Sequence, residues 1–380
     1  MAPTYHVANA VFQPYFGYTL RPGREDKFAE TRTWRANNFG FQHLVAANGA
    51  YCCDYPFPHR ESELIVGIFG GSVGSGYALF AELSGGLADG LRRVPGWENK
   101  EIRILNFAQP GFKQPQQLFT YAYFLSIGQE FDLVINIDGF NEVVTTWRNW
   151  ESGVEPNYPA DTLWGAWGRQ LEQYDLPVSE RGFLLSNYHR ISAQAARQDA
   201  RGCPFATCRY VLLALARYHQ WRAAANAGQA LTSLTERSYF PTKTFSPLPQ
   251  DLDIYRYTAA LWRNSSTAMH VLARENGTLY LHILQPNQWY EPAGPYEPID
   301  PKHPYGWVIG PVNKGYAALR SESARLRQAG VHFVDLTLMF ADRPAREVYS
   351  DDCCHYTPAG YELVFEASAA ALADIVGKAE

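Results

Sequence analysis

The sequence lacks any long hydrophobic run. No stretch approaches the roughly 18 uninterrupted apolar residues that a membrane-spanning helix needs, so we expect no integral membrane segment. The start, Met1-Ala2-Pro3, has no charged region followed by an apolar one, and no export signal is predicted from it. A cleaved signal would leave no trace, so the location of the protein in the cell stays open.

The chain also lacks an excess of positive charge. The chain has 33 Lys and Arg against 38 Asp and Glu, a formal net charge of -5. Proteins that bind nucleic acid neutralise phosphates with a basic surface, so we expect no nucleic-acid partner and favour a small-molecule ligand. Neither a Cys-x-x-Cys pair nor a Cys/His grid with zinc-ligand spacing occurs, and we expect no metal or other cofactor.

Cysteine is limited to six residues, an even number that permits three disulfides. A bond between the two vicinal pairs would tie the N-terminal region to the loop that carries His355. Such pairing would favour an oxidising compartment, either the periplasm or the outside of the cell. The cysteines are Cys52, Cys53, Cys203, Cys208, Cys353 and Cys354.

Apolar, β-branched runs followed by amphipathic segments alternate along much of the chain. This alternation predicts an α/β three-layer sandwich with a central parallel sheet of about five strands. Ligands of such folds bind at the carboxyl ends of the strands. The expected strands are Leu64–Phe69, Ile102–Phe107, Leu133–Ile137, Leu279–Leu284 and Val331–Leu336, and the clearest helices are Gly76–Arg93, Gln114–Ile127, Val312–Ala329 and Pro358–Gly377.

A large insertion, 145–255, separates the third and fourth expected strands. It contains an expected helix over 205–234 and several aromatic residues, which form either the insertion's own core or the lining of a lid over the substrate site. Residues 1–60, rich in aromatics and proline, are expected to form an irregular N-terminal wrap, and 61–380 the main domain. The aromatic residues are Trp147, Trp150, Tyr158, Trp164 and Trp167.

Ser72 lies at the apex of a glycine-rich turn after the first expected strand, in the segment 65–74, IVGIFGGSVG. Small neighbours allow a tight turn and the close approach of a substrate carbonyl to the hydroxyl. A serine hydroxyl needs a positioned base to act as a nucleophile. A serine that caps the following helix would give the same local pattern.

The base could come from His355, in the segment 349–360, YSDDCCHYTPAG, before the last expected helix. An acid three residues earlier, Asp352, can fold back to one ring nitrogen and leave the other to accept a proton from serine. Asp351 could take the same role, although the spacing favours Asp352. Alone, this pattern is also typical of an ordinary helix-entry loop.

Two further segments follow the second and third expected strands, where donors for an oxyanion hole would be needed. Gly111 offers a backbone N–H, and Asn141 offers a side-chain amide. Donors aimed at developing negative charge lower a reaction barrier by about 3 to 4 kcal/mol each. Glycine and asparagine are also common loop formers, so neither position is specific by itself.

Taken in order, Gly70-Gly71-Ser72, Gly111, Gly139-Phe140-Asn141 and Asp352-Cys353-Cys354-His355 resemble the four blocks of the SGNH (GDSL-like) hydrolases. The resemblance implies a flavodoxin-like SGNH fold over 60–145 and 275–375. It implies that Ser72 is the nucleophile, that His355 is the general base and that Asp352 orients it. It also implies an oxyanion hole built by Ser72, Gly111 and Asn141.

Two positions depart from the family's pattern: Gly71 stands where many members have Asp, and Glu142 stands where many have Asp. A rival interpretation is the Gly-x-Ser-x-Gly nucleophile elbow of α/β-hydrolases, which 70–74 also fits. That fold needs a series of strands ahead of its elbow, and we expect none in 1–63. His282, inside the fourth expected strand, is predicted to be a core residue.

The resemblance implies a serine ester hydrolase that works through an acyl-serine intermediate. Its substrate would be a small-molecule or glycan ester, as for a carbohydrate O-acetyl esterase, a carboxylesterase or a lipase. An O-acyltransferase would use the same triad and pass the acyl group to an alcohol. A binding module that keeps the fold but lacks catalysis is a third alternative. The sequence does not indicate an oligomeric state.

Overall fold

A computed structural model describes residues 10–13, 15–29, 32–46, 48–49, 51–159, 178–232, 248–249, 251–293 and 305–378. Trp164 and Trp167, singled out above, lie outside these residues. The chain divides into two compact units, one within 9–144 and 253–380 and the other within 145–252.

The first unit is built on a five-stranded parallel sheet, with the strand order β10-β9-β8-β6-β7. In chain order its strands follow the pattern 2-1-3-4-5, one of the common orders of doubly wound α/β folds. β6 and β8 are buried at every residue, as expected for central strands covered on both faces. The predicted α/β class and parallel sheet are confirmed. The strands are β6 (Glu63–Gly70), β7 (Glu101–Asn106), β8 (Leu133–Asp138), β9 (Leu279–Leu284) and β10 (His332–Asp335).

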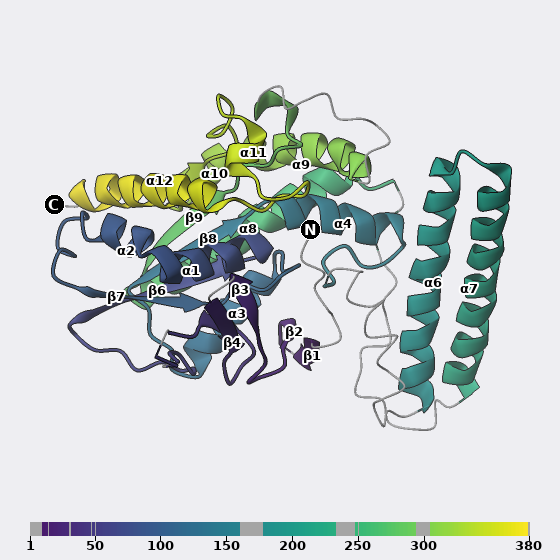
Figure 1. The fold of residues 1–380 in the computed structure, drawn as a ribbon, viewed down its shortest axis with the longest axis horizontal. Coiled ribbons are helices and arrows are strands. Elements are labelled where there is room, and N and C mark those ends of the chain that lie inside the picture. Colours follow the sequence, from purple (N-terminus) through teal and green to yellow (C-terminus); the bar gives the residue numbers. More distant parts are fainter. Residues whose placement is uncertain are drawn as a thin grey trace. The chain divides into compact units, whose positions relative to one another are not determined.

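Helices flank this sheet (Figure 1). The segment expected as one helix over 76–93 is two, because Gly85 adopts a left-handed conformation with φ +75° and ends the first. The helices are α1 (Ser72–Ser84), α2 (Gly86–Leu91), α3 (Gln116–Ser126), α4 (Phe140–Glu151), α8 (Ile254–Glu275), α9 (Ile309–Ser321), α10 (Ser323–Gln328), α11 (Ala345–Val348) and α12 (Pro358–Gly377), with short 3-10 turns at Glu291–Ala293 and Gly306–Val308.

The N-terminal segment is more regular than expected. It forms two small antiparallel sheets, one of β1 and β2 and one of β3, β4 and β5, which are separate from the parallel sheet. The expectations of an irregular wrap and of no strands in 1–63 are therefore wrong, although none of these strands belongs to the parallel sheet. The strands are β1 (Ala10–Gln13), β2 (Gly17–Leu20), β3 (Glu25–Ala29), β4 (Arg32–Ala36) and β5 (Gln42–Leu44).

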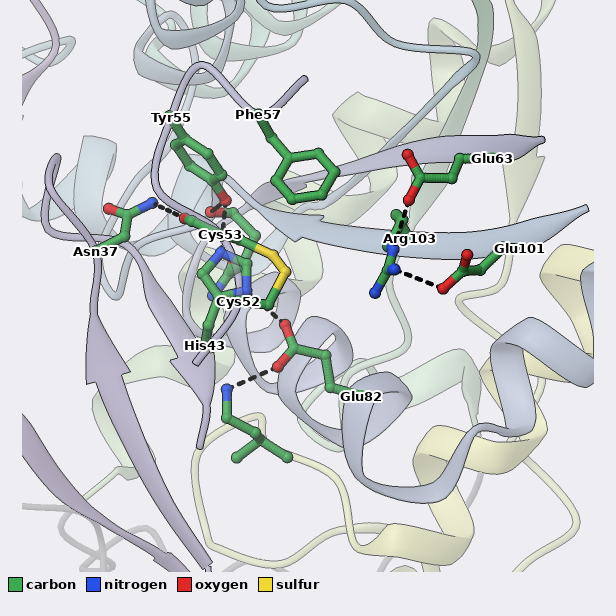
Figure 2. Close-up of a disulfide and its surroundings, with 12 residues drawn as sticks. Asn37, His43, Cys52, Cys53, Tyr55, Phe57, Glu63, Glu82, Glu101 and Arg103 are labelled. Carbon is green, nitrogen blue, oxygen red and sulfur yellow. Dashed lines mark hydrogen bonds and ion pairs between the residues drawn. A yellow bond between two sulfur atoms is a disulfide. The ribbon is translucent and has the colours of Figure 1, made fainter. Parts of the chain in front are cut away.

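A buried polar chain fastens this segment to the parallel-sheet unit (Figure 2). His43 lies between Glu82 of α1, at 2.7 Å from its Nδ1, and the Tyr55 hydroxyl, at 2.7 Å from its Nε2. The Tyr55 hydroxyl donates to the carbonyl oxygen of Asn106, at the end of β7. Because these polar groups are satisfied by one another, they can be buried without a large desolvation cost.

The disulfides differ from the pairing considered above. Cys52 bonds to its neighbour Cys53, and Cys203 bonds to Cys208. Cys353 and Cys354 are free thiols, so no bond ties the N-terminal segment to the loop of His355. Figure 2 shows the Cys52–Cys53 bond beside the chain of His43 and Tyr55.

The second unit contains two long helices, α6 (Val178–Gly202) and α7 (Ala206–Thr232), which lie side by side as a hairpin (Figure 1). Tyr158 packs against Leu184 and Ile191 of α6, which supports the view that aromatic residues here build the unit's own core. Within the described part of the chain, no helix combines the length and the apolar character that crossing a membrane requires.

Candidate active site

Ser72 is the first residue of α1, directly after β6, and its side chain is partly exposed. The N–H groups in the first turn of a helix have no intrahelical acceptor, so the backbone N–H of Ser72 can donate a hydrogen bond to a negatively charged ligand atom. Ser72 thus lies where it was expected, just beyond the carboxyl end of a central parallel strand.

The glycine before Ser72 lies against Asn141. A Cβ atom built on Gly71 would be 2.2 Å from Nδ2 of Asn141 and 3.1 Å from the carbonyl oxygen of Phe112. Any side chain at position 71 would displace the Asn141 amide. Glycine at this position therefore leaves the space that the Asn141 amide occupies.

Asn141 in turn contacts the loop that contains Gly111. Its Nδ2 donates to the carbonyl oxygen of Phe112 at 2.9 Å, which fixes the plane of the amide. Gly111 adopts φ +82°, a conformation that favours glycine and turns the chain into this contact. The structure thus brings together three of the predicted positions, those of Ser72, Gly111 and Asn141, which follow β6, β7 and β8.

Glu142 connects the same two segments. Its Oε2 accepts from the Gly139 N–H at 2.7 Å, as an acid in the first turn of a helix often does, and its Oε1 accepts from the Gln114 N–H at 3.0 Å. Burial and the charge of Asp138 raise the pKa of Glu142 to about 8. This carboxyl group joins the start of α4 to the loop after β7 and so positions Asn141 relative to Gly111.

The N-terminal sheets also hold the loop after β7, a role that the sequence did not reveal. The Tyr18 hydroxyl donates to the carbonyl oxygen of Pro110, next to Gly111. The Gln109 side chain donates to the carbonyl oxygen of Gly40 at 2.6 Å. Tyr18 and Gly40 therefore hold the two residues that precede Gly111 in the chain.

The acid beside His355 is Asp351, not Asp352. Oδ2 of Asp351 lies 2.5 Å from Nδ1 of His355. Oδ1 of Asp351 accepts from the backbone N–H groups of Cys353, Cys354 and His355 at 2.9, 3.0 and 3.2 Å. Asp352 is exposed, and its carbonyl oxygen accepts from the Trp289 indole at 2.9 Å. The assignment of Asp352 as the orienting acid is therefore wrong.

The partners of Asp351 change its acidity. Burial raises the pKa of its carboxyl group, but the hydrogen bond and charge of His355, with the backbone N–H groups, outweigh burial and lower the pKa from 3.8 to about 2. Asp351 is therefore an anion throughout the neutral range. An anion at Nδ1 keeps a proton on that nitrogen and leaves Nε2 as the basic nitrogen of the neutral ring.

Nε2 of His355 is buried and has no hydrogen-bond partner among the described residues. The hydrogen bond from Ser72 to His355 that a triad implies is thus absent from this structure. Such bonds are often long before substrate binds and tighten only in the complex. An unpartnered buried ring nitrogen on a histidine already held by a carboxylate is suited to accept a proton.

The loop of His355 is held at the carboxyl edge of the sheet. The Gln288 side chain, just beyond β9, donates to the carbonyl oxygen of Asp351 at 2.8 Å, and the Tyr356 hydroxyl donates to that of Pro286 at 2.8 Å. Tyr361, at the start of α12, lies against Gly76, four residues after Ser72, where a Cβ atom would be 2.1 Å from its hydroxyl. These three contacts bring the loop to the side of the sheet where α1 begins.

A hydrogen-bonded Ser–His–Asp chain exists in the core. Nε2 of His282 lies 2.9 Å from Asp138 and its Nδ1 lies 2.7 Å from the Ser266 hydroxyl. All three residues are at most 2% exposed, so no substrate reaches them. His282 is a core residue, as predicted, and this chain ties α8 and β9 to the end of β8, just before Asn141.

The two free thiols lie between Asp351 and His355, with their sulfur atoms 2.9 Å apart. Cys353 is partly exposed and Cys354 is buried. Burial, the thiol of Cys353 and the charge of Asp351 raise the pKa of Cys354 well above its usual value.

Iodoacetamide is expected to alkylate Cys353 at least tenfold faster than Cys354, because the thiolate is the reactive form and burial suppresses it. Mass spectrometry of the tryptic peptide over time measures both rates. In guanidinium chloride the two rates should become equal. Equal rates in the folded protein would contradict the burial of Cys354.

Among the described residues, no group of three or more His, Cys, Asp or Glu side chains could hold a metal ion. No protein-family model matches the chain, and no curated protein is significantly similar to it. A functional interpretation must therefore come from the geometry of Ser72, Asn141, Asp351 and His355.

Proposed function

We propose that the chain is a serine ester hydrolase of the SGNH (GDSL-like) class. The observation that carries the proposal is the pair of Asp351 and His355, whose unpartnered Nε2 belongs to a loop held at the edge of the sheet where Ser72 begins α1. The 2-1-3-4-5 strand order and the meeting of Gly71 with Asn141 support the SGNH type of fold.

In the proposed reaction, the Ser72 hydroxyl attacks the ester carbonyl while Nε2 of His355 accepts its proton. The negative charge that develops on the carbonyl oxygen is stabilised by the N–H groups of Ser72 and Gly111 and by the Asn141 amide. His355 then protonates the leaving alcohol. Water, deprotonated by the same nitrogen, releases the acid from the acyl-serine and restores the free enzyme.

The Asp351 carboxylate holds the imidazole in the required tautomer and stabilises the imidazolium that forms in each step. Its pKa of about 2 means that it remains charged when His355 becomes protonated. Asp138 and Glu142 flank the segment of Asn141 in the chain. Both are buried and bound by hydrogen bonds to protein groups, so in the proposal they help to position Asn141 and transfer no proton.

Fluorophosphonate labelling tests the proposal. The probe is expected to phosphonylate Ser72 of the wild type and to leave Ser72→Ala unlabelled, with the modified peptide located by mass spectrometry. Ser75→Ala is the matched control, because its hydroxyl lies one helical turn away but is buried and donates to Gln42 at 2.9 Å.

Ser75→Ala should label like the wild type. Absence of label on folded wild-type protein, or label that survives Ser72→Ala, would refute Ser72 as an activated nucleophile. Folding of each variant is checked by circular dichroism. A labelled Ser72 with acyl transfer to added alcohols in preference to water would identify an O-acyltransferase that uses the same residues.

A further inference from the structure

The helix α7 exposes large apolar side chains outside its contact with α6. In that contact, Asn226 and Ala230 lie against Gly182 of α6, and both are buried. Much of the remaining surface is exposed and aromatic, with Tyr218 at its border, where the ring meets that of His189 of α6. Its large apolar side chains are between 43% and 76% exposed: Tyr210, Val211, Leu213, Leu215, Tyr218 and Trp221, with Phe205 of the hairpin turn at 70%.

Single exposed apolar residues need no explanation, but several large ones close together on one helix mark an interaction surface. The patch is defined here as the α7 face, the seven residues just named.

Arginines are interleaved with the α7 face. Arg209, Leu213, Arg217 and Trp221 follow one another at intervals of four residues and so form one row along the helix. Arg209 and Arg217 are exposed. A long guanidinium side chain can lie along an apolar surface with its charge at a polar boundary.

The charge of the hairpin is opposite to that of the whole protein. Residues 178–232 hold seven arginines against two acids, Glu180 and Asp199, a formal charge of +5 in a chain of -5. No Asp or Glu occurs between 200 and 235. The disulfide Cys203–Cys208 closes the hairpin turn, beside Phe205 and the exposed Arg201.

We infer that the α7 face docks on an anionic lipid surface. Aromatic and aliphatic side chains on a positively charged helix are the features of helices that lie in the plane of a membrane interface. Guanidinium groups bind phosphate in a bidentate manner, which suits lipid headgroups. In the inferred docking, α7 lies in the plane of the interface.

Vesicle sedimentation tests the inference on the full chain. The wild type is expected to bind vesicles of phosphatidylcholine with 30% phosphatidylglycerol at least tenfold more strongly than vesicles of phosphatidylcholine alone. Raising the salt from 0.1 to 0.5 M should weaken binding, because ions screen surface charges.

Two variants separate the apolar and the electrostatic contributions to vesicle binding. Leu213→Ser/Trp221→Ser should lower the partition coefficient at least tenfold through loss of buried apolar surface. Arg209→Gln/Arg217→Gln should lower it by about fivefold for each charge on anionic vesicles only. Arg256→Gln/Arg274→Gln removes two exposed arginines of α8 and should bind like the wild type.

Three results would overturn the inference. One is binding to anionic vesicles no stronger than to phosphatidylcholine, and another is equal binding by Leu213→Ser/Trp221→Ser. The third is a dimer by light scattering that this variant abolishes without vesicle binding by the wild type, which would assign the face to a second copy. All variants change exposed residues, and circular dichroism checks that each keeps its helix content.

Discussion

Asp351→Asn is expected to lower kcat/KM for a small activated ester about 10³- to 10⁴-fold, whereas Asp352→Asn should lower it less than about threefold. The two residues are neighbours with the same charge, but only Asp351 contacts Nδ1 of His355. An asparagine at 351 can present its N–H₂ group to the ring and favour the wrong tautomer. Initial rates of p-nitrophenyl acetate hydrolysis measure both variants.

The loss in Asp351→Asn should fall on kcat rather than KM, and fluorophosphonate labelling of Ser72 should slow in parallel. A merely structural role would lower the folded fraction instead, so thermal unfolding of both variants is the companion measurement. If Asp352→Asn lost as much activity as Asp351→Asn, the hydrogen bonds described for this loop would not be those of the working enzyme.

Asn141→Ala is expected to lower kcat about 10²- to 10³-fold, the usual cost of removing one oxyanion donor. Gly71→Ala should reproduce most of this loss, because its Cβ would occupy the position of the Asn141 amide, 2.2 Å from Nδ2. The same ester assay measures both variants, and KM should change little.

Gly310→Ala is the matched control, since a Cβ atom there meets nothing within 4 Å. It should keep wild-type activity and stability. Full activity in Gly71→Ala beside an inactive Asn141→Ala would mean that the glycine does not set the position of the amide. Full activity in Asn141→Ala would remove Asn141 from the proposed oxyanion hole.

The parallel sheet could be predicted from sequence nearly to the residue, because continuous apolar runs such as 64–69 and 279–284 are typical of strands buried on both faces. The N-terminal strands could not. β3, Glu25–Ala29, holds three charged residues in a row, so its sequence carries no apolar alternation. Its strand conformation comes from pairing with β4, a contact between segments that composition does not encode.

The candidate site was predictable where the fold alone determines position. Residues that follow parallel strands meet at one edge, which is why the segments of Ser72, Gly111 and Asn141 were found in order. The acid partner of His355 depended on a local turn instead. Asp351 accepts hydrogen bonds from three successive backbone N–H groups, in a turn of the kind that asparagine and aspartate often form. This turn brings His355 back to the acid four residues before it, whereas the prediction had favoured the acid three residues before it.

The disulfides were undetermined for a different reason. An even number of cysteines allows several pairings, and their choice depends on distances in the folded chain. Cys52 pairs within its own segment, while Cys353 and Cys354 remain thiols. The supporting roles of Tyr18 and Gln109 also depend on contacts between distant segments, for which the sequence offers no local signal.

The single carboxylate that holds the loop of His355 has a consequence for tolerance of acid. Because the pKa of Asp351 is lowered from 3.8 to about 2, its contribution to stability is present above the unfolded pKa, declines below it, and is gone once the pH has fallen through 2. The imidazole and three amide groups would be released in one step when this group takes up a proton. At pH 3 this carboxylate is still mostly ionised in the folded protein, so its hydrogen bonds persist there although part of their stabilising effect has already been lost.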